Sequence, residues 1–222
     1  LASRDKMRGV EVIIHENTPM LLNRHTAAEE SDRSMVGIGS TRKGSGRALI
    51  EKIERDPERV LTAGQVMNEY IRHYAQLVFG ICDIYVADHS TYLERMRESV
   101  VMQVEGAQGY SLGINSGQYP YTTSRECTPA QICSDTLVPH RLVTNIIGVA
   151  RTYPIRVANR YDKDGNQVGW SGPHYPDQRE LDWYQDLNME PETTTVTTRP
   201  RRVFSWSRMQ FREACYAIQP DE

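Results

Sequence analysis

The first indication of the fold is an apolar run that ends among glycines, Val100-Val101-Met102-Gln103-Val104-Glu105-Gly106-Ala107-Gln108-Gly109. Three valines among five residues favour a β-strand over residues 100–104. Because the glycines leave the backbone open, the Gln108 amide can lie at a strand end and donate to an oxygen that gains charge. Glycine-rich turns follow many strands that carry no site, so this pattern alone favours an ordinary turn.

Helical and strand patterns alternate on both sides of this run. Further strands are expected over residues 10–14 and 145–150, with a strand or extended loop over 193–205 and a hairpin turn at 162–166. Helices are expected over residues 18–33, 63–79, 90–99 and 208–218. A further helix is expected after the glycines that end at Gly46, and another should begin at Thr128 as cap with Pro129 in its first turn. The alternation is typical of an α/β fold with helices flanking a central mixed or parallel sheet.

The composition is that of a globular protein. We expect one domain over residues 1–222, and the 39% hydrophobic and 25% charged residues exclude a disordered chain. A net charge of −3 argues against a general nucleic-acid binder, and no apolar run is long enough to cross a membrane. The four cysteines of the chain form no Cys-x-x-Cys pair, so they do not predict a zinc site. Scattered thiols of this kind are typical of proteins in a reducing cytoplasm.

A glycine-rich loop reads Gly37-Ile38-Gly39-Ser40-Thr41-Arg42-Lys43-Gly44-Ser45-Gly46-Arg47. Glycines allow a ligand to approach the backbone, hydroxyls and N–H groups at a helix start favour an anion, and Lys43 and Arg47 add positive charge. The spacing fits neither a Walker A loop nor the dinucleotide fingerprint. Phosphate binding and a solvated surface loop explain the pattern equally well.

Two other segments have the composition of anion sites. Tyr119-Pro120-Tyr121-Thr122-Thr123-Ser124-Arg125 gathers hydroxyls before a helix, as ordinary capping also does. Thr193-Thr194-Thr195-Val196-Thr197-Thr198-Arg199-Pro200-Arg201-Arg202 sets three arginines behind threonines. Such arginines can clamp a carboxylate or phosphate, contact RNA, or form a solvated face. The six histidines show neither triad order nor a metal pair on one helix face.

Taken in order, these segments resemble the adenylosuccinate synthetases. Gly39-Ser40-Thr41 resembles the family's Gly-Thr-Thr phosphate loop, and residues 105–109 match its Glu-Gly-Ala-Gln-Gly motif. Residues 119–124 match Tyr-Pro-Tyr-x-Thr-Ser, Arg156-Val157 resembles Arg-Val-Gly, and residues 199–202 resemble the arginine clamp. The order and spacing of the motifs are more specific than any one of them.

Other details are most similar to the phage branch of the 2-aminoadenine pathway, the PurZ type. They lie at residues 122–130, 175–178 and 203–207, and the resemblance extends from residue 10 to residue 222. It implies a P-loop-NTPase-like synthetase fold without the family's N- and C-terminal parts. The chain is therefore expected to be an interior fragment, inactive by itself.

The resemblance implies roles for the matching residues around the substrate nucleotide. Ser40, Thr41 and Thr123 would hold its 5′-phosphate. Arg55, at the family spacing after Thr41, would reach the same phosphate across a homodimer interface. Gln108 would contact the base near its reacting oxygen, which makes it the catalytic candidate in this chain.

Further roles follow from the same resemblance. The Val157 backbone would meet the sugar and Arg199 would bind the substrate nucleotide, while Arg201 would face the nucleoside triphosphate. The loop expected to close on L-aspartate consists of Thr195, Val196, Thr197 and Thr198. Magnesium is implied as a cofactor, with its ligands outside this chain. Arg42 and Ala158 stand where the family usually has glycine.

The implied reaction joins L-aspartate to C6 of a purine nucleoside monophosphate through a 6-phosphoryl intermediate. The phage branch implies dGMP with ATP, in the host cytoplasm. The nearest alternative is inosinate (IMP) with GTP, and the residues that would decide between the two substrates lie outside the chain. An alternative of another class is a non-catalytic nucleotide-binding or dimerisation module.

Overall fold

The computed structural model describes residues 11–66, 83–193 and 199–222. The chain divides into two compact units. Unit 1 comprises residues 1–26 and 44–103, and unit 2 comprises residues 27–43 and 104–222. The prediction of one domain over residues 1–222 stays a prediction. None of the helices in the described ranges is both long and apolar enough to span a membrane.

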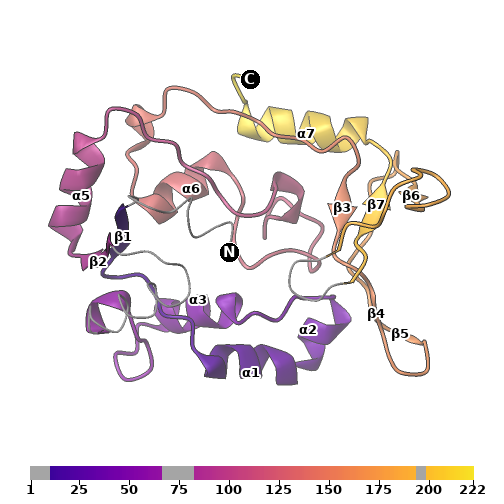
Figure 1. The fold of residues 1–222 in the computed structure, drawn as a ribbon, viewed down its shortest axis with the longest axis horizontal. Coiled ribbons are helices and arrows are strands. Elements are labelled where there is room, and N and C mark those ends of the chain that lie inside the picture. Colours follow the sequence, from indigo (N-terminus) through magenta and orange to yellow (C-terminus); the bar gives the residue numbers. More distant parts are fainter. Residues whose placement is uncertain (1–10, 67–82, 194–198) are drawn as a thin grey trace. The chain divides into compact units, whose positions relative to one another are not determined.

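Unit 1 is built on a parallel strand pair. β1 (Glu11–His15) pairs with β2 (Asp83–Ala87), with Val12 opposite Ile84, and β1 confirms the strand expected at residues 10–14. Ile84 is buried among partly buried neighbours at Val12, Ile14, Val66 and Val86. α5 (His89–Glu98) follows β2 directly, as expected for residues 90–99, and packs on both strands (Figure 1).

The first expected helix starts later than its sequence suggests. α1 spans Asn23–Ser31, whereas Thr18 was the expected cap. The Thr18 carbonyl accepts from the Ala63 N–H, and the Met20 N–H donates to the Leu61 carbonyl, both at 2.8 Å. This pairing holds residues 18–20 extended, so the helix cannot begin there. The expected helix at 63–79 starts as a 3-10 turn at Ala63–Gln65, and most of its length lies outside the described residues.

A carboxylate joins the beginning of α1 to α3 (Ser45–Glu54), the helix after the glycine-rich loop. Glu51 accepts from Arg24 at 2.8 Å and contacts the His25 Nε2 at 2.9 Å. The Leu22 N–H donates to the His25 Nδ1 at 3.0 Å, so the proton of the neutral ring is on Nε2 and points to Glu51. These bonds lower the pKa of Glu51 to about 2, with the Arg24 hydrogen bond as the largest cause.

Unit 2 contains two small antiparallel sheets, whose strands β3 to β7 are labelled in Figure 1. One has the order β3-β7-β6, and the other is the hairpin β4-β5. The bounds are β3 (Ile155–Arg156), β4 (Arg160–Tyr161), β5 (Gln167–Gly169), β6 (Glu180–Leu181) and β7 (Arg202–Phe204). The turn expected at 162–166 joins β4 to β5, and the segment expected over 193–205 contributes β7 to the first sheet.

The helices of unit 2 begin where the sequence has Asp, Pro or Ser, although Thr128 makes no side-chain capping hydrogen bond. α2 (Arg33–Gly37) has Asp32 as its cap, α6 (Pro129–Thr136) starts after Thr128, and α7 (Arg208–Ile218) confirms the last expected helix. Val203, Phe204 and Ser207, where β7 leads into α7, are the most deeply buried large side chains. The core of this unit therefore lies at the β7–α7 junction.

Two expected strands are wrong. Residues 100–104 form no strand, and Val100 and Val101 are 98% and 86% exposed. A β-branched run needs a partner strand, and none of the described residues pairs with it. Residues 145–150 are also no strand, because the Ile146 N–H donates to the Asp221 carboxylate and the Gly148 N–H to the Glu222 carbonyl. The α/β class is confirmed, but its strands form small separate sheets.

Candidate nucleotide-binding site

A hollow in unit 2 brings together four of the residues that the sequence assigns to the substrate nucleotide: Ser40, Thr41, Val157 and Arg199. Gly39, Ala158 and Arg160 complete its lining. The hollow has a volume of about 20 Å³, which is room for about one water molecule. Its walls would have to separate to admit a phosphate.

The loop that carries Ser40 and Thr41 follows the C-terminal end of α2. The Gly39 N–H donates to the Val36 carbonyl and the Ser40 N–H to the Met35 carbonyl, both at 3.0 Å. We expected N–H groups at a helix start to be open to an anion, and for Ser40 this is wrong because its N–H completes α2. The Ser40 Oγ accepts from the Arg42 N–H at 3.2 Å, so its hydroxyl can still donate to a ligand, as can the Thr41 hydroxyl.

Close backbone contacts fix this loop against the end of β5. Gly39 has a φ of 70°, and a Cβ there would lie 3.2 Å from the Ser171 Cα and 3.3 Å from the Trp170 carbonyl oxygen. The Trp170 N–H donates to the Gly37 carbonyl at 3.0 Å. A Cβ on Gly169 would overlap the Val36 carbonyl oxygen. The loop therefore requires glycine both in its own sequence and in the strand behind it.

Arg160 is a residue of the hollow that the sequence reasoning missed. It is the first residue of β4, is only 7% exposed, and donates from Nη2 to the Ser40 carbonyl oxygen. Burial, together with the charges of Arg42 and Arg199, lowers its pKa. It belongs to none of the motifs, and only its closeness to Arg156-Val157 in the sequence could have drawn attention to it.

Arg156 joins the Tyr-Pro-Tyr segment to the sheets. Its Nη2 donates to the Tyr121 carbonyl at 2.8 Å and its Nε to the Ser171 carbonyl at 2.7 Å. Burial, and next the charge of Arg202, lowers the pKa of Arg156 to about 10. Thr123 is half-buried, and its N–H donates to the Leu112 carbonyl at 2.8 Å. Thr123 does not line the hollow, so its phosphate contact stays a prediction.

Gln108 is exposed at a strained turn. Its φ of 71° is uncommon for a residue other than glycine, and such conformations concentrate at functional sites. A Cβ at Gly106 would overlap the Ile132 Cδ1 of α6, so a larger residue there would require the Ile132 side chain to move. Gln108 does not line the hollow with Ser40 and Thr41, and its catalytic role stays a prediction.

Glu126 was also missed by the sequence reasoning, and it organises the segment between these motifs. Its carboxylate accepts from the Ser116 hydroxyl at 2.6 Å and from the N–H groups of Asn115, Ser116 and Cys127. Burial disfavours its charged form, but these hydrogen bonds outweigh burial and lower the pKa of Glu126. Its position directly after Arg125 in the motif was the available signal.

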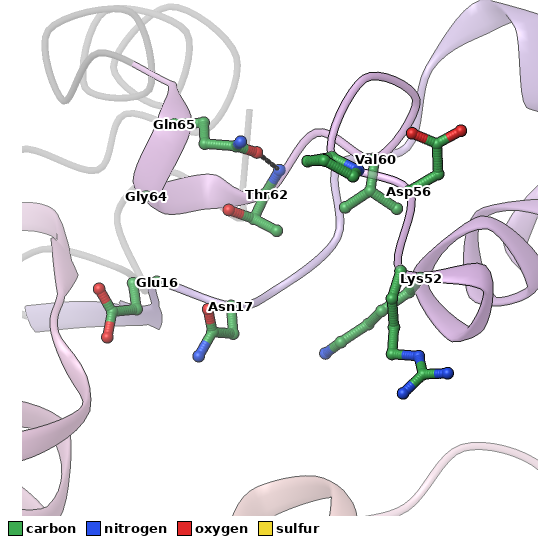
Figure 2. A pocket seen from close by; sticks show the side chains of 10 residues that line it. Glu16, Asn17, Lys52, Asp56, Val60, Thr62, Gly64 and Gln65 are labelled. Carbon is green, nitrogen blue, oxygen red and sulfur yellow. Dashed lines mark hydrogen bonds between the residues drawn. The ribbon is translucent and has the colours of Figure 1, made fainter.

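Arg55 lies in unit 1 and lines a separate pocket of about 520 Å³. It ends α3 with a φ of 59° and is exposed. Figure 2 shows Glu16, Asn17 and Lys52 around this pocket, together with the hydrogen bond between the Thr62 N–H and the Gln65 side chain. The role of Arg55 across a dimer interface stays a prediction.

The arginines of residues 199–202, the segment that resembles the family's arginine clamp, have different surroundings. Arg201 lies 3.3 Å from Glu192, and Arg202 forms a forked pair with Glu180 at 2.6 and 2.8 Å. Arg202 also donates to the Gly172 carbonyl, so it holds β7 to its neighbours rather than facing a ligand. The aspartate loop, residues 195–198, lies outside the described residues. Within the described ranges, no group of three His, Cys, Asp or Glu side chains could hold a metal ion.

The chain matches known proteins over most of its length. A family model described as adenylosuccinate synthetase matches residues 58–219. The N6-succino-2-amino-2′-deoxyadenylate synthase of Acinetobacter phage SH-Ab 15497 is 46% identical over 239 residues, covering 100% of this chain and 60% of the phage protein. The adenylosuccinate synthetase of Thermodesulfovibrio yellowstonii is 28% identical over 182 residues, covering 68% of this chain and 43% of that protein.

A solved structure agrees with these matches. The succinoaminodeoxyadenylate synthetase (PurZ) of Cyanophage S-2L, bound to dGMP and dATP as an energy donor, gives a TM-score of 0.79 at 38% identity, over 96% of this chain and 57% of that chain. The chain thus spans about 60% of the length of the phage protein from Acinetobacter phage SH-Ab 15497. The expected synthetase fold is confirmed, and this chain belongs to the adenylosuccinate synthetase family.

Proposed function

We propose that the protein containing this chain joins L-aspartate to C6 of a purine nucleoside monophosphate, at the expense of a nucleoside triphosphate. The observation that carries the proposal is the convergence of Ser40, Thr41, Val157 and Arg199 on one hollow. They come from three segments that are far apart in the sequence, and the family resemblance implies for each residue a part in binding the substrate nucleotide.

The reaction has two steps. The purine N1–H gives its proton to a base and O6 attacks the γ-phosphorus of the triphosphate, so that an O6–P bond forms and a nucleoside diphosphate leaves. The aspartate amine then attacks C6, the C6–O6 bond breaks, inorganic phosphate leaves and the amine loses a proton. A carbonyl oxygen is a poor leaving group and phosphate is a good one, so the first step makes the second possible.

In this proposal the residues of the chain bind and orient the reactants. Ser40 and Thr41 hold the 5′-phosphate, and Val157 and Arg199 fix the sugar end of the nucleotide. Gln108, on its strained turn, donates to the base oxygen as negative charge develops on it. Residues 195–198 close on aspartate, and Arg201 exchanges Glu192 for the triphosphate. Magnesium would offset phosphoryl charge, and its ligands are proposed to lie outside the described residues.

We further propose dGMP as the substrate and ATP as the donor. The support is the difference in identity between the phage relative, at 46%, and the relative from Thermodesulfovibrio yellowstonii, at 28%. The related Cyanophage S-2L structure holds dGMP and dATP. The product would be a 2-amino-2′-deoxyadenylosuccinate.

The test is turnover by the protein expressed from its complete reading frame. It is incubated with aspartate and magnesium, with dGMP or inosinate as acceptor and ATP or GTP as donor. We expect the succinylated product and inorganic phosphate in equal amounts from dGMP with ATP. Turnover of inosinate alone would contradict the dGMP proposal, and no product from any pair would contradict the ligase proposal.

The proposed homodimer rests on Arg55. If Arg55 completes the phosphate site of a second copy, Arg55→Leu and Thr41→Ala are each inactive, but mixing them creates dimers with one intact site. Recovered activity on mixing supports the shared site. Two active single variants, or no recovery after mixing under conditions that exchange subunits, would exclude it.

A further inference from the structure

The Arg160 guanidinium is a buried cation with little hydrogen bonding. Only 7% of the residue is exposed, and within the described ranges it donates one hydrogen bond, to the Ser40 carbonyl oxygen. Its Nε is fully buried and has no partner there. A guanidinium has five N–H donors, and buried charges are normally paired because desolvation is costly. This cation therefore has one buried donor, Nε, that no group within the described ranges satisfies.

The charges around Arg160 add to the cost of burying its guanidinium. Arg42 and Arg199 both act on it, and both lower its pKa after the larger effect of burial. Among the described ion pairs, none includes Arg160. The Arg42 Nε is also buried without a hydrogen-bond partner. Arg160 and Arg199 both line the hollow, and their two positive charges favour an anion as its occupant.

The lining of the hollow points to a phosphate. Ser40 and Thr41 add hydroxyl donors beside Arg160. A phosphate monoester offers three oxygens and up to two negative charges, which can satisfy hydroxyls and guanidinium groups together, whereas a carboxylate offers two oxygens and one charge. Arg160 already holds the Ser40 carbonyl, so the same side chain would fix the loop and contact the ligand.

We propose that Arg160 binds the 5′-phosphate of the substrate nucleotide directly, beside Ser40 and Thr41. This inference rests on the proposed function, and it assigns a phosphate ligand that the family motifs do not include. Opening of the hollow by the incoming phosphate would give the buried Arg160 guanidinium an anionic partner.

The test compares ligands with and without the phosphate. Binding of dGMP and of deoxyguanosine is measured by calorimetry for the wild-type protein, Arg160→Gln and Arg160→Lys, each made from the complete reading frame. Loss of one charge-assisted hydrogen bond should weaken dGMP binding by about 10- to 100-fold in Arg160→Gln. Deoxyguanosine affinity should stay unchanged, and Arg160→Lys should recover part of the loss. The control is Arg179→Gln, which removes the same charge from an exposed position in unit 2.

The outcomes separate this inference from the proposed function. Unchanged dGMP affinity in Arg160→Gln, with tight binding by the wild type, overturns the inference and leaves the ligase proposal standing. Equal losses for dGMP and deoxyguanosine also overturn it, because Arg160 then acts only by holding the loop. Weaker binding of aspartate with normal dGMP affinity would assign the cation to the carboxylate instead. If the wild-type protein binds no purine nucleotide, that result contradicts the proposed function itself.

Discussion

Replacing Glu51 by glutamine should destabilise the protein in a strongly pH-dependent way. Glu51 joins α1 to α3 through Arg24 and His25, and its pKa is lowered from 4.5 to about 2. At about 1.4 kcal/mol per pKa unit, this shift sets a ceiling of about 3 kcal/mol on what the charged form adds. The Arg24 side chain is half-exposed, so solvent screening reduces the expected loss to about 1–2 kcal/mol.

The sign of the pH dependence follows from the direction of the shift. A carboxylate with a lowered pKa stabilises the fold fully above the unfolded pKa of 4.5, and this stabilisation is lost as the pH falls toward 2. At pH 7, Glu51→Gln should lower the midpoint of thermal unfolding by about 2–8 °C for a chain of this size. The difference from wild type should stay constant down to about pH 5 and shrink below it.

The assay is thermal unfolding followed by circular dichroism between pH 7 and pH 3. Glu54→Gln is the matched control, because Glu54 lies on the same helix and pairs with Arg59 at 3.2 Å on the exposed surface. That pair should contribute less than about 1 kcal/mol. Equal melting of Glu51→Gln and wild type at pH 7 would refute the reasoning, as would a difference that persists undiminished at pH 3.

Three further predictions concern unit 2. Gly169→Ala should cost about 1–3 kcal/mol because its Cβ would overlap the Val36 carbonyl oxygen; an unchanged melting temperature would contradict the close packing. Arg42, at a φ of 53°, should tolerate glycine better than alanine by about 1 kcal/mol, so Arg42→Gly should melt above Arg42→Ala, and the reverse order would contradict the strain. Because the Glu126 pKa is lowered, Glu126→Gln should destabilise the protein at pH 7, by a margin that shrinks as the pH falls below 4.5. A margin independent of pH would show that the charge of Glu126 does not matter.

Local signals predicted the elements whose partners are close in the sequence. Asp162 and Gly165 predicted the β4–β5 hairpin, and Pro129 predicted the start of α6. The strand expected at residues 100–104 failed because a β-branched run records a tendency to pair, not the presence of a partner. Thr18 was misread as a cap because its backbone pairs with Ala63, 45 residues further along the chain.

The site was predictable to the extent that family motifs carried it. Ser40, Thr41, Val157 and Arg199 were assigned from the resemblance and meet in one hollow. Arg160 belongs to none of the motifs, and composition cannot show which arginine of a charged chain becomes buried. Arg160 is buried because β4 packs against the loop that carries Ser40 and Thr41.

The hydrogen bond from Arg160 to Ser40 also has a consequence for the order of events during translation. Its two residues are 120 positions apart. At about 5–20 residues per second, a ribosome adds Arg160 about 6–24 seconds after Ser40. Throughout that interval Ser40 and Thr41 exist on the growing chain without the cation that holds their backbone. The loop at Ser40 and Thr41 is therefore synthesised well before the side chain that holds its backbone.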